Sequence, residues 1–274
     1  MKASIASFSL HKEGGTEDEY EDAFETFPDE AGSDGVHVSV VRMAVSDGAS
    51  ESALAGRWAR SLTRWFVQAP SGTARSADEF AGQVVNAVRS WEATLGDYVA
   101  KREAEGRPIQ WYEQPKLDRG AYATLLTVDF SVPPCEEAVP EPAEEIVWYA
   151  AAMGDSALFH VRDGKLVTAF PMTHSGDFNL TPDLVNSRTM DADLIAGRVR
   201  LHKGTLRQGD DVYMCTDAVA AWFLTEAERG CRPWELLRDL GTRDGQDFAT
   251  LVREERASGR MRNDDVTLLH MDVW

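Results

Sequence analysis

Acidic residues stand at the ends of several apolar segments of this sequence. The stretch "MAVSDGAS" places Asp47 and Gly48 directly after residues 38–45, an apolar, β-branched run that is typical of a buried strand. A helix is expected over residues 51–67, almost immediately after this pair. Asp47 should therefore lie at a strand end, where side chains meet solvent. Taken alone, it is also what an ordinary turn aspartate before glycine looks like.

The same placement recurs along the chain. Acidic residues follow the first predicted strand, occupy a Gly-Asp turn, end a β-rich run and begin the last strand: Glu21 and Asp22, Asp155, Asp217, and Asp264 with Asp265. If the sheets stack, several of these strand ends converge. Converging carboxylates raise one another's pKa unless a cation neutralises them. Oxygen ligands without cysteine or histidine suit Mg²⁺ or Mn²⁺, and two such ions could hold a hydroxide for an in-line displacement at phosphorus.

Composition excludes several other classes of function. The net charge of −18, from 28 basic and 46 acidic residues, argues against a general nucleic-acid binder and against an anionic membrane surface. The three cysteines and six histidines have no zinc-ligand spacing. No apolar run is long enough to span a bilayer, and the first residues do not read as a secretory signal. We expect a reduced, cytoplasmic compartment.

The expected elements separate strands from helices. Strands are predicted over residues 3–10, 36–45, 121–132, 144–170 and 264–274, and helices over 51–67, 76–106, 233–240 and 247–259. A strand running into a helix is predicted over 210–224. Residues 171–198 are expected to be irregular, and the acidic, proline-rich residues 133–145 an exposed hairpin loop. This segregation predicts an α+β fold with antiparallel sheets covered by helices. No composition break divides the chain, so one domain over residues 1–274 is expected.

The order of these motifs resembles the metal-dependent serine/threonine phosphatases of the PP2C (PPM) type, in the short variant seen in bacteria. "MAVSDGAS" is similar to the family's V-x-D-G, "YATLLTV" to its G-x-T-A strand and "AAMGDSALFHVRDGKL" to its G-D-S-R-x-Y strand. "GDDVYMCTDAVAAWF" resembles the segment around S-D-G-L/V, and "NDDVTLL" resembles D-N-V-T. The resemblance extends from Glu21 to Thr267.

The resemblance implies a four-layer αββα sandwich with two Mn²⁺ or Mg²⁺ ions in the cleft between the sheets. In that scheme Asp47 bridges both ions, the Gly48 carbonyl binds one, and Asp217 and Asp264 hold the second. Glu21 and Asp22 orient metal-bound waters, and Asp155 matches a third, weaker metal position. A hydroxide bridging the ions attacks phosphoserine or phosphothreonine directly, so no phosphoenzyme is expected. The implied partners are phosphoproteins of a bacterial serine/threonine kinase system.

Two departures from the family pattern leave alternatives open. Ala49 stands where D-G-H-G-G has its general-acid histidine, and the phosphate-binding arginine is missing from its usual place before Glu21. Lys12 could replace that arginine as a point charge, or it could be a solvated surface residue. A pseudophosphatase that binds phosphoproteins without hydrolysing them is therefore the second hypothesis, and an acidic metal-binding scaffold the third.

Overall fold

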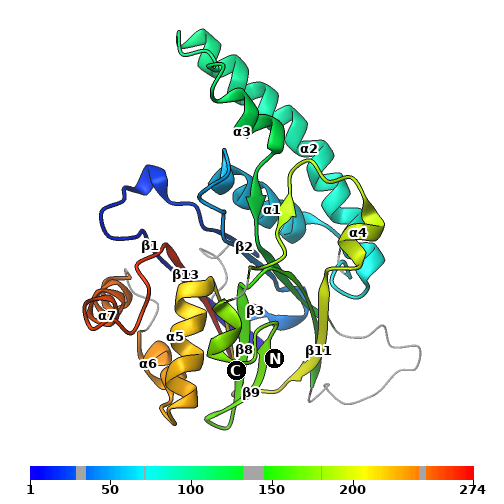
Figure 1. Cartoon of the computed structure of the whole chain (residues 1–274). Helices are drawn as coiled ribbons and strands as arrows, with labels where there is room; N and C mark the ends of the chain where they lie inside the picture. The colour runs from blue at the N-terminus through cyan, green and yellow to red at the C-terminus, as the bar shows by residue number, and fades with distance from the viewer. Residues whose placement is uncertain (29–34, 71, 132–144, 180, 241–244) are drawn as a thin grey trace, which may run out of the picture.

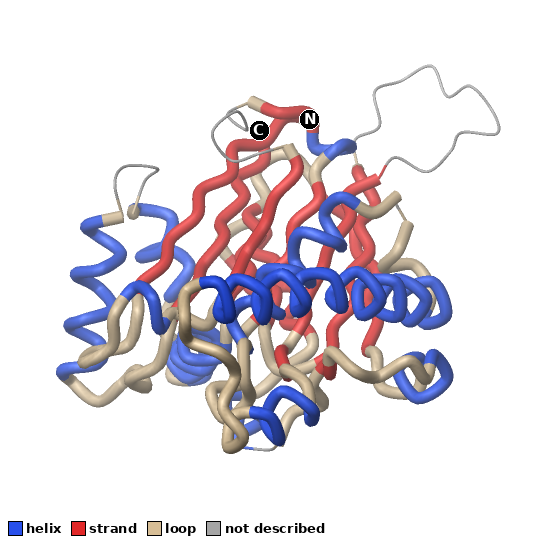
Figure 2. Tube along the Cα trace, turned by 90° about the horizontal axis from the view of Figure 1, so that it is seen from above, coloured by secondary structure: helices blue, strands red, loops and turns tan. Residues whose placement is uncertain are grey.

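Two stacked antiparallel β-sheets form the centre of the molecule, with helices on both outer sides (Figures 1 and 2). The computed structural model describes residues 1–28, 35–70, 72–131, 145–179, 181–240 and 245–274. Its strands are β1 Lys2–Leu10, β2 Ala23–Phe27, β3 Val36–His37, β4 Arg42–Ser46, β5 Tyr122–Ala123, β6 Leu125–Ser131, β7 Ile146–Met153, β8 Ala157–Arg162, β9 Lys165–Phe170, β10 Val185–Asn186, β11 Arg200–Leu206, β12 Asp211–Cys215 and β13 Val266–Val273. Its helices are α1 Ala55–Gln68, α2 Ala77–Ala104, α3 Gln114–Arg119, α4 Ala192–Ala196, α5 Asp217–Glu228, α6 Pro233–Asp239 and α7 Gln246–Ala257.

The strand order confirms the predicted antiparallel architecture. The first sheet runs β3-β1-β13-β12-β8-β9 and the second β11-β7-β6-β4-β2, while β10 and β5 form a separate two-stranded ribbon. All strand pairs in the described part of the chain are antiparallel. Strands β8 and β9 are paired and are joined by a turn of only two residues, which is possible because antiparallel neighbours need only a short connection.

Strand β12 shows how the residue pattern produces four layers. Val212 and Met214 lie in the core between the two sheets, whereas Tyr213 and Cys215 lie in the core between the first sheet and α5, α6 and α7. A third core joins the second sheet to α1 and α2 and contains the fully buried Trp58. The arrangement is therefore the predicted αββα sandwich, in which every layer hides an apolar face from water.

Several local predictions were wrong or incomplete. Residues 36–45 do not form one strand: β3 pairs in the first sheet, a 3₁₀ turn follows at Val38–Val40, and β4 pairs in the second sheet. The helix expected from residue 51 begins only at Ala55, after Leu54 with φ of 64°. Strands β2 and β11 and helix α3 were not predicted, and residues 171–198, expected to be irregular, contain β10 and α4. The predicted loop over residues 133–145 lies outside the described residues except for Glu145.

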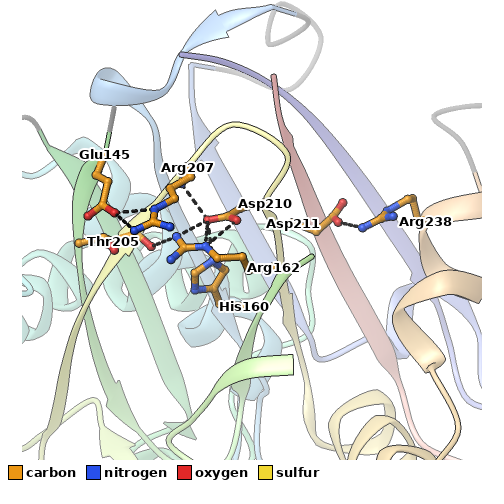
Figure 3. Close-up of polar contacts among 8 residues, drawn as sticks. All are labelled: Glu145, His160, Arg162, Thr205, Arg207, Asp210, Asp211 and Arg238. Atoms are coloured by element: carbon orange, nitrogen blue, oxygen red, sulfur yellow. Dashed lines mark hydrogen bonds and ion pairs between the residues drawn. The ribbon is translucent and has the colours of Figure 1, made fainter. Parts of the chain in front are cut away.

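A network of hydrogen bonds and ion pairs joins β12 to its neighbouring strands β8 and β13 at the point where β12 begins (Figure 3). Asp210 is 1% exposed and accepts hydrogen bonds from His160 at 2.8 Å and from Arg162 at 2.6 Å, both on the neighbouring strand β8. The next residue, Asp211, bonds instead to His270 of β13 at 2.8 Å and to Arg238 of α6. These two aspartates thus join β12 to both of its neighbours and to the helical layer.

Within the described residues, none of the helices combines the length and the apolarity that crossing a membrane would require.

Candidate functional site

The strand pairing brings all the predicted acidic residues to one edge of the sandwich. In the second sheet the end of β4 lies beside the starts of β2 and β6 and the end of β7, because Ser46 pairs with Ala23, Val45 with Leu126, and Leu125 with Met153. In the first sheet the end of β12 lies beside the starts of β8 and β13. The segments that carry Asp22, Asp47, Asp155, Asp217 and Asp264 therefore all meet at this edge.

The loop after β4 is fixed by close packing around Gly48. A side-chain carbon at this position would lie 2.7 Å from the Ala55 carbonyl carbon and 2.8 Å from the Glu21 carbonyl oxygen, so only glycine fits. The preceding residue, Asp47, donates its backbone N–H to the Thr124 hydroxyl at 2.8 Å. The Asp47 carboxyl has a pKa well above its usual range, because of burial first and then the charges of Asp22 and three further aspartates.

Asp22 lies deepest in the cluster, with only 2% of its surface exposed. Its Oδ2 accepts hydrogen bonds from the hydroxyls of Thr216 at 2.9 Å and Thr267 at 3.0 Å, one beside each of the two strand ends in the first sheet. Burial raises the pKa of this carboxyl to about 8, an effect that the two threonine hydrogen bonds oppose and the charge of Asp265 reinforces. Asp22 is thus held in one orientation and is costly to ionise without a neighbouring cation.

Asp217 offers an unsatisfied oxygen to the same region. It is the first residue of α5, and its Oδ1 is buried without a hydrogen-bond partner. Burial, together with the charges of Asp155 and Asp264, raises its pKa to about 6. The guanidinium of Arg262 lies 3.5 Å from the other carboxylate oxygen and lowers that pKa, while it also donates to the carbonyl of Phe178.

Asp155 and Asp264 lie at the rim of the cluster. Asp155 is 8% exposed, and its pKa is raised by burial. It follows Gly154, whose φ of 107° and contact with Thr124 leave no room for a side chain. Asp264 is half-buried and accepts the backbone N–H of Asp265 at 2.9 Å. Both carboxylates thus act on Asp47 mainly through their charge.

Glu21 and Lys12 stand together on the outer side of the cluster. The Glu21 carboxylate accepts a hydrogen bond from the Ser50 hydroxyl and lies 4.0 Å from the Lys12 ammonium. Asp265 ties the two segments together, because its carboxylate accepts the backbone N–H of Lys12 and that of Glu21, each at 2.9 Å. Lys12 is therefore near the cluster, as expected, and already has an acidic partner.

The cluster is chemically suited to a hard cation, although it is not a closed metal cage. Within the described part of the chain, no group of three or more acidic, histidine or cysteine side chains is already arranged to hold a metal ion. Carboxylates without a counter-ion repel one another, and here several of them have raised pKa values. The unpartnered oxygen of Asp217 and the oxygen-only donor set fit Mg²⁺ or Mn²⁺.

Several residues that build the site had no predicted role. Thr124, Thr216 and Thr267 orient the aspartates through their hydroxyls, and Asp265 holds the Lys12 and Glu21 backbones. The sequence did offer a signal for these four residues, because each of them lies within one of the motifs that resemble the phosphatase family. Arg262 had no signal, because its approach to Asp217 arises only from the folded chain.

Comparison of the whole fold with solved structures gives consistent neighbours. The catalytic domain of the serine/threonine phosphatase PstP, in complex with two manganese ions, matches with a TM-score of 0.54 and 16% identity over 99% of this chain and 98% of that one. The chain has the fold of these phosphatases. A serine/threonine phosphatase from S. agalactiae matches with a TM-score of 0.54 and 12% identity over 99% of this chain and 100% of that one.

A regulatory protein has the same fold. PppA, a key regulatory component of T6SS in Pseudomonas aeruginosa, matches with a TM-score of 0.52 and 16% identity over 100% of this chain and 99% of that one. The sequence itself matches no family model, and no curated protein is significantly similar to it. The likeness to the PP2C-type phosphatases is therefore one of fold, and the roles of individual residues have to be argued from this chain.

Proposed function

We propose that this protein is a Mn²⁺- or Mg²⁺-dependent phosphatase that hydrolyses phosphoserine and phosphothreonine in proteins. The observation that carries the proposal is the convergence of five aspartates at one sheet edge, where Asp47 is under the charge of the other four. Repulsion between clustered carboxylates destabilises a structural core, whereas a site for divalent cations needs several carboxylate ligands close together. The fold shared with PP2C-type phosphatases supports the same reading.

In this proposal the residues divide the work by position. Asp47, the Gly48 carbonyl, Asp217 and Asp264 hold two ions, and Asp155 contributes to a third position. Bound ions of this kind supply positive charge for the phosphate and a water of lowered pKa as the nucleophile. Glu21 and Asp22 orient water, with Asp22 fixed by its threonine hydrogen bonds. Lys12 attracts the phosphate as a point charge.

The first test is hydrolysis of p-nitrophenyl phosphate and of a phosphothreonine peptide by the purified protein. We expect turnover with Mn²⁺, none with EDTA, and a loss of at least about 100-fold in the variant Asp47→Asn. The variant Asp239→Asn, which changes an exposed aspartate at the end of α6, is the matched control and should keep full activity. Turnover that persists in EDTA would contradict the proposal.

The second candidate is a pseudophosphatase that binds phosphoproteins without turnover. It is favoured by the lack of an assembled metal cage among the described residues and by the shared fold of a regulatory component. Saturable Mn²⁺ binding without hydrolysis of any phosphopeptide would select this candidate. Absence of both Mn²⁺ binding and phosphopeptide binding would contradict both.

We further propose that the whole chain, residues 1–274, acts as one such unit on phosphoproteins of a serine/threonine kinase system, in the cytoplasm. The absence of a basic stripe in a chain of net charge −18 supports a protein substrate over nucleic acid.

A further inference from the structure

A cavity of about 650 Å³, lined by polar and apolar surface in equal parts, opens beside the aspartate cluster. One wall is the first part of helix α1, with Arg57 and Arg60, and the opposite wall is the chain before β2, with Lys12 and Glu21. Ser50 lies at its rim and donates to Glu21, which directly precedes the buried Asp22. A phosphoprotein segment with its phosphate at the cluster would therefore have this cavity next to it.

The two arginines on the α1 wall stand apart from the carboxylates of the described part of the chain. Among the described residues, neither guanidinium is within ion-pair distance of a carboxylate; Arg57 lies 5.1 Å from the centre of the Tyr98 ring. Both side chains are exposed, and they lie three positions apart, on one side of the helix. Burial and the charge of Arg57 lower the pKa of the Arg60 guanidinium, an effect that the nearby Tyr20 hydroxyl partly opposes.

The next arginine on the same helix behaves differently. Arg64, one turn after Arg60, lies 3.9 Å from the Glu25 carboxylate. Two of the four acids that line the cavity are engaged: Glu19 accepts the Thr16 backbone N–H at 3.0 Å, and Glu21 bonds to Ser50 and faces Lys12. The other two, Glu13 and Asp18, also line the cavity. On helix α1 the arginines without a carboxylate at ion-pair distance among the described residues are thus Arg57 and Arg60, in a chain of net charge −18.

We propose that Arg57 and Arg60 form a binding site for an acidic side chain that flanks the phosphorylated residue of the substrate. An aspartate or glutamate near the phosphoserine or phosphothreonine would relieve the repulsion between the two guanidiniums and form charge-assisted hydrogen bonds with them. The inference deepens the proposed function and rests on it for the position of the phosphate. This site would let a protein of net negative charge prefer acidic phosphopeptides.

Two labelled phosphothreonine peptides test the proposal, one flanked on both sides by aspartate and one flanked by serine. Fluorescence anisotropy with Mn²⁺, on the same peptides made with a non-hydrolysable phosphonate, measures binding without turnover, and hydrolysis of the phosphothreonine peptides with Mn²⁺ measures kcat/KM. We expect the wild type to prefer the acidic peptide by about tenfold at low salt, as two exposed charge pairs would give. The preference should shrink in high salt because exposed charges are screened.

The double variant Arg57→Gln, Arg60→Gln should abolish this preference, whereas the matched variant Arg64→Gln on the same helix should keep it. Equal binding of the two peptides by the wild type, binding too weak to measure, or equal loss in both variants would overturn the proposal. A retained binding preference in a protein that hydrolyses neither peptide would support this site while refuting the phosphatase proposal.

Discussion

Replacing Asp210 by asparagine should destabilise the fold strongly at neutral pH, because one carboxylate accepts hydrogen bonds from three residues where β12 begins (Figure 3). It accepts bonds from His160 at 2.8 Å, from two nitrogens of Arg162 at 2.9 and 2.6 Å, and from the Arg207 backbone N–H at 2.8 Å. Asparagine keeps the shape of the side chain but loses the negative charge. Its amide NH₂ group, which cannot accept a hydrogen bond, would replace one of the two carboxylate oxygens that accept from these donors.

The pKa of Asp210 gives the expected size of the effect. Burial would raise this pKa, but the bonds from His160 and Arg162 outweigh burial and lower the pKa from the usual 3.8 to about 2. That difference corresponds to roughly 2.5 kcal/mol of stability at neutral pH. Removing one partner of a buried ionic network costs about 3–5 kcal/mol. We therefore expect about 3 kcal/mol, or a decrease in Tm of roughly 6–10 °C for a chain of this size.

Urea and thermal unfolding at pH 7, 5 and 3 provide the assay. A carboxyl with a lowered folded pKa stabilises the fold above pH 3.8, and this contribution is lost as the pH falls towards 2. The difference between wild type and Asp210→Asn should therefore be full at pH 7 and smaller at pH 3. The control Glu145→Gln removes the exposed partner of Arg207 and should cost less than about 1 kcal/mol. A variant whose Tm lies within 2 °C of wild type at pH 7 would refute the reasoning.

Three further changes probe the candidate site. Gly48→Ala places a carbon 2.7 Å from the Ala55 carbonyl carbon and 2.8 Å from the Glu21 carbonyl oxygen. The variant should lower the free energy of unfolding in urea by about 1–3 kcal/mol and abolish Mn²⁺-dependent hydrolysis. An unchanged free energy of unfolding would contradict the close packing around Gly48. Asp47→Asn in EDTA should be as stable as wild type or more so, because burial and like charges raise the pKa of its carboxyl; a clear decrease in Tm would mean a structural role. Asp265→Ala leaves two backbone N–H groups without their acceptor and should cost about 2 kcal/mol in urea unfolding, whereas a change below about 0.5 kcal/mol would show that water replaces the carboxylate.

The apolar pattern of single segments predicted most of the fold, because each element packs against a neighbouring layer and its sequence shows which of its faces are covered. Residues 211–215 are apolar at nearly every position, and both faces of β12 are indeed covered, by the second sheet on one side and by helices on the other. Strand β11 was missed for the opposite reason. Its sequence "RLHKGTL" is largely polar and exposed, and β11 forms a strand by pairing with β7 at the edge of the second sheet.

The break within residues 36–45 also had no local signal. Each part of this run favours an extended chain, so its pattern predicts one strand. In the folded protein β3 belongs to one sheet and β4 to the other, and the chain needs the 3₁₀ turn at Val38–Val40 to cross between them. Sheet membership is a property of the partner strands, which lie far away in the sequence.

The sequence by itself determined which residues could do chemistry here: carboxylates at strand ends, next to turns that expose them. Only the tertiary structure decided their environment, because the groups that orient and charge them are distant along the chain. Asp22 is fixed by the hydroxyls of Thr216 and Thr267, 194 and 245 residues away, and Asp265 holds the Lys12 backbone from 253 residues away. Burial and mutual repulsion, which raise the pKa values of the clustered aspartates, exist only once the two sheets have stacked.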